Sequence, residues 1–240
     1  YVAGNLPQSE AEQLIIKTEN SLKEKIFENK TPCPPAASQA AEARVVKLKP
    51  GNPSVLFTRN GPNPANDNSA AVVCYQISLD SARVNALTEL LAHIGKRPAF
   101  HQLRTVEQLG YLTFFTSYWT AAVRNLVFII QSSAHSAAYL ESRIQNFLPL
   151  LRENLAELTQ EEFSSQIEEL AKVKLERPKR LREVASKDWR EIDDGVERFD
   201  RQEIEVEELR RLTHHDLMEF FDNNILDESS RKKLSVHVQA

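Results

Sequence analysis

The sequence predicts an α+β fold in which a mostly antiparallel sheet is covered on one face by several helices. Two segments, 45–79 and 111–131, each hold strand-like runs on either side of a turn, as a hairpin does. Helical periodicity fills the segment between them and most of the chain after them, and residues 234–238 alternate as a strand does. Hairpins build antiparallel sheets, and helices gathered late in a chain cover one face of such a sheet.

The first 43 residues are predicted to be separate from the main domain. Residues 1–5 look like the end of a strand that runs into a turn. A helix is expected from Pro7 to Phe27, because Pro is tolerated in a first helical turn and apolar residues then recur at helical spacing. The proline-rich run after Thr31 ends this helix. We therefore divide the chain into residues 1–29, a linker at 30–43 and a main domain at 44–240.

The main domain opens with strands. Residues 45–48 and 54–58 are strand-like and are separated by a Pro-Gly pair. Residues 60–68 form a turn-rich loop, and residues 71–79 form a strand rich in β-branched and aromatic residues. This pattern predicts a hairpin with a long tip.

A helix follows the first hairpin. Asp80 or Ser81 is a suitable N-cap for a helix whose apolar positions recur up to Ile94, and Pro98 punctuates it. A short helical piece is expected to continue to Gln108.

Gly110 is expected to end that piece in the left-handed conformation, which glycine adopts at little cost. Residues 111–117 and 126–131 then form a second hairpin. The second of these strands has no polar face, so it is predicted to be a central strand.

The rest of the chain is predicted to be mostly helical. Thr159 and Glu162 have the spacing of a capping box. Pro178 separates the helix that follows this box from a highly charged one. The predicted late elements are helices at 137–155, 159–174, 179–199, 206–212 and 213–221 and a final strand at 234–238.

Composition excludes two kinds of partner. The 240 residues carry a net charge of −4, and the charged segment 179–211 mixes both signs, whereas nucleic-acid binding needs clustered positive charge. No apolar run approaches the ~20 residues of a membrane-spanning helix. We therefore expect neither a nucleic-acid nor a membrane partner. The two cysteines, Cys33 and Cys74, lack metal-ligand spacing and favour a reducing compartment.

Complete catalytic motifs are absent from the sequence. None of the six histidines lies in an H-x-x-E-H or H-E-x-x-H frame, and there is no G-x-S-x-G motif or glycine-rich phosphate loop. His215 and Glu219 lie four residues apart on one predicted helix face and could share a metal, although a solvated helix start is the favoured interpretation. The sequence therefore predicts neither a catalytic residue nor a metal ligand in this chain.

A binding constellation is the candidate site that the residues themselves offer. Arg104 and Tyr111 flank a short turn into a strand. Arg presents five rigid donors that suit carbonyls and carboxylates, and an exposed strand edge can accept an extended peptide. A structural role fits the same residues, with Arg104 on a helix surface and Tyr111 as a half-buried strand start. Both interpretations stay open at this point.

The segment from Phe100 to Tyr111 also resembles the F-x-x-L-R-T-x-E-Q-L-G-Y stretch of the insulin-degrading (pitrilysin-type) metalloproteases. The resemblance continues in order over nearly the whole chain. Its further runs are Gly4-Asn5 and residues 124–131, 139–143, 174–179, 199–201 and 235–238.

This resemblance implies four homologous α+β domains, arranged as two halves that close around a peptide chamber, with zinc and a catalytic Glu in the first domain. Residues 1–29 then correspond to the last strand and helix of the third domain, and residues 44–240 to the fourth. The resemblance further implies that Arg104 and Tyr111 contact the substrate backbone near the scissile bond. The implied partners are peptide substrates and the N-terminal half of the same enzyme, which binds the zinc. The chain is then expected to be inactive alone.

Two further expectations follow from the resemblance. The parent enzyme is expected to be intracellular, either cytoplasmic or peroxisomal, and the organelle is unreadable because no targeting tail follows Ala240. The start at Tyr1 without an initiator methionine suggests a piece of a longer protein. The alternative is an inactive assembly module, similar to the non-catalytic subunits of mitochondrial processing peptidases.

Overall fold

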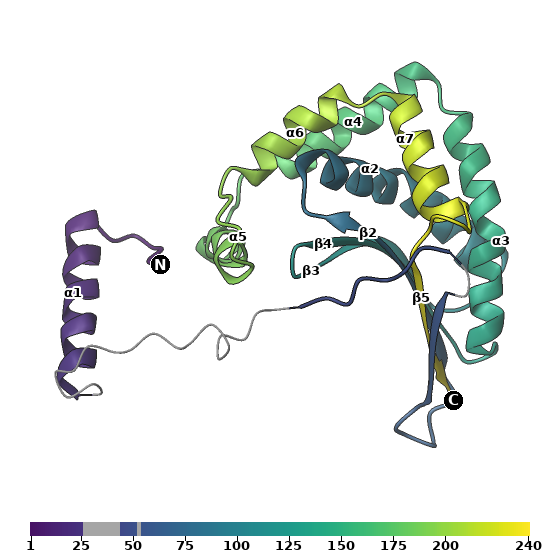
Figure 1. Ribbon diagram of the computed structural model, residues 1–240, viewed down its shortest axis with the longest axis horizontal. Helices are drawn as coiled ribbons and strands as arrows, with labels where there is room; N and C mark the ends of the chain where they lie inside the picture. The colour runs from purple at the N-terminus through teal and green to yellow at the C-terminus, as the bar shows by residue number, and fades with distance from the viewer. Residues whose placement is uncertain (26–43, 52–53) are drawn as a thin grey trace. The chain divides into compact units, whose positions relative to one another are not determined.

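The computed structural model describes residues 1–25, 44–51 and 54–240 (Figure 1). The predicted linker at 30–43, Cys33 and the last residues of the first predicted helix lie outside this part. The chain forms two compact units. One, the helical unit, comprises Tyr1–Arg44 and Arg177–Phe199; the other, the sheet unit, comprises Val45–Glu176 and Asp200–Ala240.

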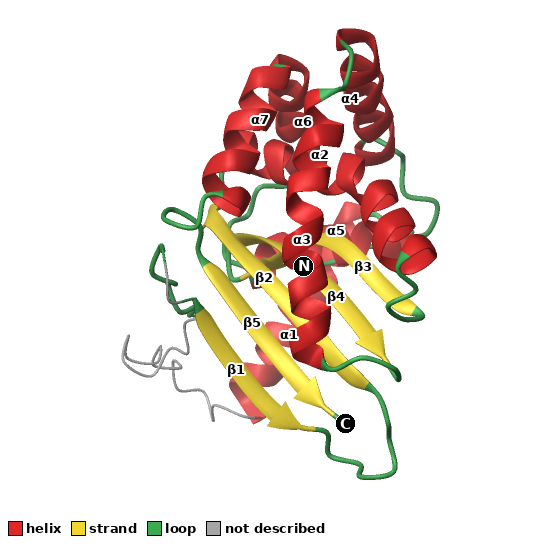
Figure 2. Ribbon diagram, turned by 90° about the vertical axis from the view of Figure 1, so that its right-hand side faces the viewer, coloured by secondary structure: helices red, strands yellow, loops and turns green. Residues whose placement is uncertain are grey.

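A five-stranded sheet with the order β1-β5-β2-β4-β3 forms the base of the sheet unit (Figure 2). Every pairing is antiparallel except that of β1 with β5. The strands are β1 (Val55–Asn60), β2 (Ser69–Leu79), β3 (Leu112–Thr120), β4 (Val123–Ser132) and β5 (Lys233–Gln239).

The helices of the sheet unit cover one face of this sheet (Figure 1), which confirms the predicted α+β class. Phe128 of β4 packs against Phe115 of β3 and Phe147 of a covering helix, with ring centroids 4.3 and 6.2 Å apart, in the core between sheet and helices. The covering elements are α2 (Ala82–Ala99), α3 (Ala137–Ala156), α4 (Gln160–Lys174), α6 (Arg201–Arg211), α7 (His214–Phe221) and the π-helical turns η1 (Phe100–Val106) and η2 (Asp222–Leu226).

Side chains cap these helices where the sequence indicates. Ser81 accepts a hydrogen bond from the Val84 N–H, and Thr159 and Glu162 form the predicted capping box. Such caps satisfy N–H groups that a helix start leaves unpaired, so they fix where each helix begins.

The first predicted hairpin is wrong. Strand β1 does not pair with β2, because β5 lies between them and pairs with both. The connection between β1 and β2 is too long to impose a tight hairpin, so it can pass the width of one intervening strand, about 4.8 Å on each side.

Residues 45–48 are likewise not a strand. The side chain of Gln76 pairs with this segment, accepting from the Leu48 N–H at 2.8 Å and donating to the Val46 carbonyl at 2.9 Å. An amide side chain, and not a neighbouring strand, thus pairs with two backbone groups of this segment.

The second predicted hairpin is confirmed. Strands β3 and β4 pair in continuous register, and β4 is an interior strand with Leu126, Phe128 and Ile130 buried. Ala121 and Ala122 join the strands with φ of 43° and 59°. A two-residue turn with both φ values positive matches the twist of a hairpin, although glycine or asparagine is usual there.

Pro98 does not end its helix, contrary to the prediction. Helix α2 continues through Pro98 to Ala99 and runs directly into η1. Proline lacks the N–H for the preceding turn, and the wider π-helical turn begins just after it.

The helical unit contains α1 (Gln8–Lys25) and α5 (Leu181–Asp193). None of the 18 residues of α1 is buried. The hydroxyl of Tyr1 donates to Asp188 at 2.7 Å, within this unit.

Three further predictions, two in the helical unit and one in the sheet unit, are corrected. Residues 1–5 form no strand, because Gly4 and Asn5 already lie in a bend. The helix expected at 179–199 ends at Asp193, since the chain takes positive φ at Gly195 and Glu197. The helix expected at 206–212 begins earlier, at Arg201.

In the part of the chain that the structure describes, no helix has the length and apolar character to cross a membrane.

Candidate functional site

The segment from Phe100 to Tyr111 links the end of α2 to the start of β3. Leu103 and Leu109 are almost completely buried and anchor the segment in the core. Between them the chain leaves η1, and Gln108 takes a φ of 52°. The two leucines and this change of direction hold the intervening polar residues at the surface.

Glu107 ties the segment to α3. Its carboxylate accepts from the Nε of Arg143 at 2.5 Å and from the side-chain amide of Gln102 at 2.9 Å. The hydrogen bond from Arg143 is the main reason why the pKa of Glu107 lies below its usual range. Glu107 therefore has a structural role in this segment and is not free to act as a base.

Gly110 has a different role from the predicted one. The left-handed residue is Gln108, whereas Gly110 allows close approach of two backbones. A Cβ at Gly110 would lie 1.8 Å from the carbonyl oxygen of Gln131 in β4. Only glycine fits here. Its missing side chain lets the backbone of the segment lie close against strand β4 immediately before Tyr111.

Arg104 and Tyr111 lie together at the surface, as the binding interpretation requires. The guanidinium carbon of Arg104 lies over the ring of Tyr111, 5.0 Å from its centroid, and over the ring of Phe100, 4.6 Å from its centroid. Tyr111 is 81% exposed and Phe100 is 42% exposed. Sequence reasoning missed Phe100 as a site residue, although its spacing of four from Arg104 in a helical segment is a usable signal.

The polar groups of these two residues are available to a ligand. Neither the guanidinium of Arg104 nor the hydroxyl of Tyr111 has a hydrogen bond or ion pair with any residue in the described ranges. The site therefore offers several N–H donors and one phenolic O–H at the start of an edge strand, β3. Carbonyl and carboxylate oxygens are the groups that such donors bind.

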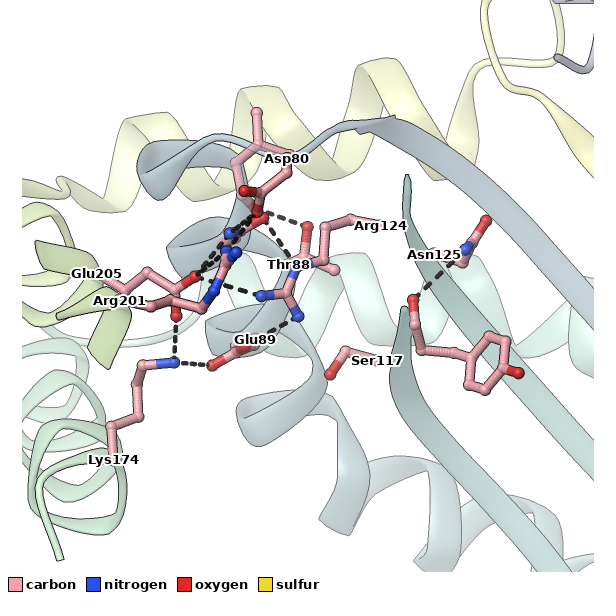
Figure 3. A network of polar contacts seen from close by, with 12 residues as sticks. Asp80, Thr88, Glu89, Ser117, Arg124, Asn125, Lys174, Arg201 and Glu205 are labelled. Atoms are coloured by element: carbon pink, nitrogen blue, oxygen red, sulfur yellow. Dashed lines mark hydrogen bonds and ion pairs between the residues drawn. The ribbon is translucent and has the colours of Figure 1, made fainter. Parts of the chain in front are cut away.

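A second polar cluster, which we call the neck network, lies deep in the sheet unit where the chain leaves at Glu176 and returns at Asp200 (Figure 3). The carboxylate of Glu205 accepts from Lys174 at 2.7 Å and lies 3.2 Å from Arg124. Arg201 pairs with Asp80 at 2.6 Å. The charged members are the carboxylates Asp80, Glu89 and Glu205 and the cations Arg124, Lys174 and Arg201.

The neck network is balanced in charge and paired within itself. Three carboxylates face three cations, and Asn85 bridges the network by donating to Glu205 at 2.6 Å and accepting from Arg124 at 2.8 Å. The ring of Trp119 lies 4.4 Å from the guanidinium carbon of Arg124 and 4.2 Å from that of Arg201. Buried charges need such partners, so we interpret this cluster as structural.

The described residues contain no zinc site. No group of three or more of their His, Cys, Asp or Glu side chains could hold a metal ion. His215 and Glu219 both lie exposed on α7, and they belong to no such group among the residues that the structure describes.

The chain is similar in sequence and in fold to known proteins. Residues 90–189 match the family model described as PQQ synthase PqqF-like, C-terminal lobe domain 4. The fold of pitrilysin aligns with a TM-score of 0.78 at 23% identity, over 98% of this chain and 24% of that one. The class of protein defined by the fold is thus the metalloprotease-homology domain.

Proteins with similar sequences identify the family more narrowly than the fold does. The peroxisomal insulin-degrading enzyme-like 1 of Arabidopsis thaliana is 37% identical over 99% of this chain and 24% of its own length. The insulin-degrading enzyme of Homo sapiens is 36% identical over 77% of this chain and 18% of its own length. A putative zinc protease of Schizosaccharomyces pombe is 35% identical over 99% of this chain.

The chain belongs to the insulin-degrading-enzyme-like, pitrilysin-type family and corresponds to the C-terminal region of its members. It spans about a quarter of the length of the Arabidopsis relatives. The boundaries predicted between the third and fourth homologous domains stay a prediction.

Proposed function

We propose that this chain is the substrate-contacting C-terminal part of a zinc metallopeptidase and closes a peptide chamber whose zinc lies on the N-terminal half. The observation that carries the proposal is the guanidinium of Arg104, which has no ion pair among the described residues and lies beside the exposed Tyr111 at the start of an edge strand. Relatives named as insulin-degrading enzymes and as a putative zinc protease support the reaction class.

Each residue has a separate role in this proposal. Arg104 donates to backbone carbonyls of an extended peptide and orients it. The hydroxyl of Tyr111 donates to the carbonyl oxygen of the scissile bond as that oxygen gains charge. Neither role depends on the substrate side chains, so the site suits a peptidase that accepts several sequences.

Strand β3 is a suitable support for a bound peptide. It is an edge strand, and its sequence carries no charge and no proline, the usual features that protect an edge from pairing. Its exposed side chains include Phe114 and Tyr118. An extended peptide can pair with such an edge through its backbone.

The test is reconstitution. We expect no peptide cleavage by this chain alone and cleavage when it is mixed with the zinc-bearing half of the same enzyme. Substitution of Arg104 by Ala should weaken peptide binding to the isolated chain, with the fold unchanged by circular dichroism. Full activity and unchanged peptide affinity in this variant would remove the role assigned to Arg104.

An assembly module is the second candidate, and exposure on β1 favours it. Val55, Leu56 and Phe57 are each at least 50% exposed on this edge strand. Exposed apolar side chains on an edge strand can mark a protein interface. Size-exclusion chromatography separates the two functions, because an assembly module associates without binding peptide.

The parent enzyme is proposed to be intracellular. The one location stated among the relatives described above is the peroxisome, for the Arabidopsis protein. Cytoplasmic placement is the alternative, and microscopy of the tagged full-length protein decides between them.

A further inference from the structure

Within residues 1–25, 44–51 and 54–240, the guanidinium of Arg104 contacts aromatic rings and no acidic side chain. Its guanidinium carbon lies over the rings of Phe100 and Tyr111, which come from the two ends of the same segment. Phe100 is the first residue of η1, four positions before Arg104, and Tyr111 directly precedes β3.

The kind of partner decides what the guanidinium can still do. A carboxylate partner would take up the N–H donors and cancel the charge. A ring interacts with the positive charge through its face and forms no hydrogen bond with the donors. The two rings can therefore restrict the long side chain while its donors stay free for a ligand.

Phe100 has little structural reason to be aromatic. It is 42% exposed, whereas the nearby Leu103 and Leu109 are buried and anchor the segment. Its ring is found against the Arg104 guanidinium. An exposed leucine would serve equally well if packing against the core were its purpose.

We propose that Phe100 is a positioning residue for Arg104: together with the ring of Tyr111 it orders the guanidinium before peptide arrives. This inference rests on the proposed function, since it assumes that Arg104 binds peptide carbonyls. It assigns the ring of Tyr111 a part that is separate from that of its hydroxyl. It also makes the site a preorganised donor for neutral carbonyl oxygens.

The test compares Phe100→Leu with Phe100→Trp in the full 240-residue chain. The first readout is the NMR resonance of the Arg104 Nε–H, assigned by its loss in Arg104→Lys. We expect Phe100→Leu to shift this resonance toward that of a free arginine and Phe100→Trp to return it upfield, because a ring face shields the group above it. The second readout is the Kd of an extended neutral peptide, which should rise about two- to fivefold in Phe100→Leu and recover in Phe100→Trp.

Phe57→Leu is the matched control, because Phe57 is 56% exposed on β1 at the other edge of the sheet. It should change neither readout. An unmoved Arg104 resonance in Phe100→Leu, or no recovery in Phe100→Trp, overturns the role of Phe100. If Arg104→Ala leaves the peptide Kd unchanged, the proposed function fails instead, and the resonance still decides whether Phe100 orders Arg104.

Discussion

The guanidinium carbon of Arg104 lies 5.0 Å from the centroid of the Tyr111 ring, although the end of a π-helical turn and a left-handed residue lie between them in the chain. The turn reverses the chain and brings its two ends to one place on the surface. The ring contact leaves the hydroxyl of Tyr111 and the donors of Arg104 unpaired within the described residues.

Substitution of Tyr111 by Phe separates the ring from the hydroxyl. The ring stays over Arg104, so peptide affinity should be unchanged, whereas the loss of one donor to the developing oxyanion should lower turnover by about 10²–10³-fold. The measurement is kcat after reconstitution with the zinc-bearing half. Tyr118→Phe, at a 57% exposed tyrosine of β3, is the control and should retain full turnover. Equal rates for the two variants would show that the Tyr111 hydroxyl has no part in the reaction.

Substitution of Gly110 by Ala should destabilise the sheet unit. The new Cβ would meet the Gln131 carbonyl at 1.8 Å, and a backbone oxygen cannot move aside as a flexible side chain can. We expect a loss of about 1–3 kcal/mol in urea unfolding. Gly61→Ala is the milder comparison, because its Cβ would lie 3.3 Å from the nearest oxygen. Equal losses at the two glycines would contradict the close approach at Gly110.

Glu141 should make stability depend on pH. Burial by itself would raise the pKa of this carboxyl, but hydrogen bonds from Lys233 and Ser235 outweigh burial, so the pKa lies below its usual value. A lowered pKa in the folded state contributes stability above the unfolded value of about 4.5, and this stability is lost as pH falls through the folded pKa.

The variant Glu141→Gln tests this linkage. At pH 7 we expect it to be about 1–3 kcal/mol less stable than the parent chain, because the largely buried Lys233 loses its charged partner. The difference should shrink as the pH is lowered below 4.5 in urea unfolding experiments. A difference that is the same at pH 7 and at pH 3 would rule out Glu141 as the source.

Glu205→Gln should strongly destabilise the sheet unit. The side chain of Glu205 is 3% exposed and faces Arg124 and Lys174, which would be left buried with one carboxylate fewer. Breaking a buried ion pair from one side typically costs about 3–5 kcal/mol. Glu208→Gln removes an exposed pair with Arg211 and should cost less than about 1 kcal/mol. Unfolding of both variants, followed by circular dichroism, checks the difference, and a small loss in Glu205→Gln would contradict the structural role of the network.

Local patterns in the sequence predicted much of the fold. Caps such as Ser81 and Thr159 gave helix starts, because their hydrogen bonds involve neighbours in the chain. The apolar run of β4 predicted an interior strand, because burial on both faces requires it. The α+β class followed from the order of these elements.

The predictions that were wrong concern contacts between residues far apart in the chain. The position of β5 between β1 and β2 is a non-local pairing that no local pattern encodes. The prediction that Gly110 ends a helix in the left-handed conformation was wrong. The reason for glycine is the backbone of Gln131, which excludes a side chain there and is distant in sequence.

The candidate site depended on similar information. Arg104 and Tyr111 were predicted by resemblance, while composition and spacing left their role open. Their contact, and that of Phe100, needed the geometry of the turn.

The neck network has a consequence for engineering the chain. Lys174 and Arg201 flank the excursion of residues 177–199 and both bind Glu205, so the points of exit and return lie side by side. We expect that residues 177–199 can be excised and replaced by a few glycines while α4 and α6 stay packed against each other. The shortened sheet unit could then be fused to other proteins. The junction between Glu176 and Asp200 would be the place at which to insert a reporter domain.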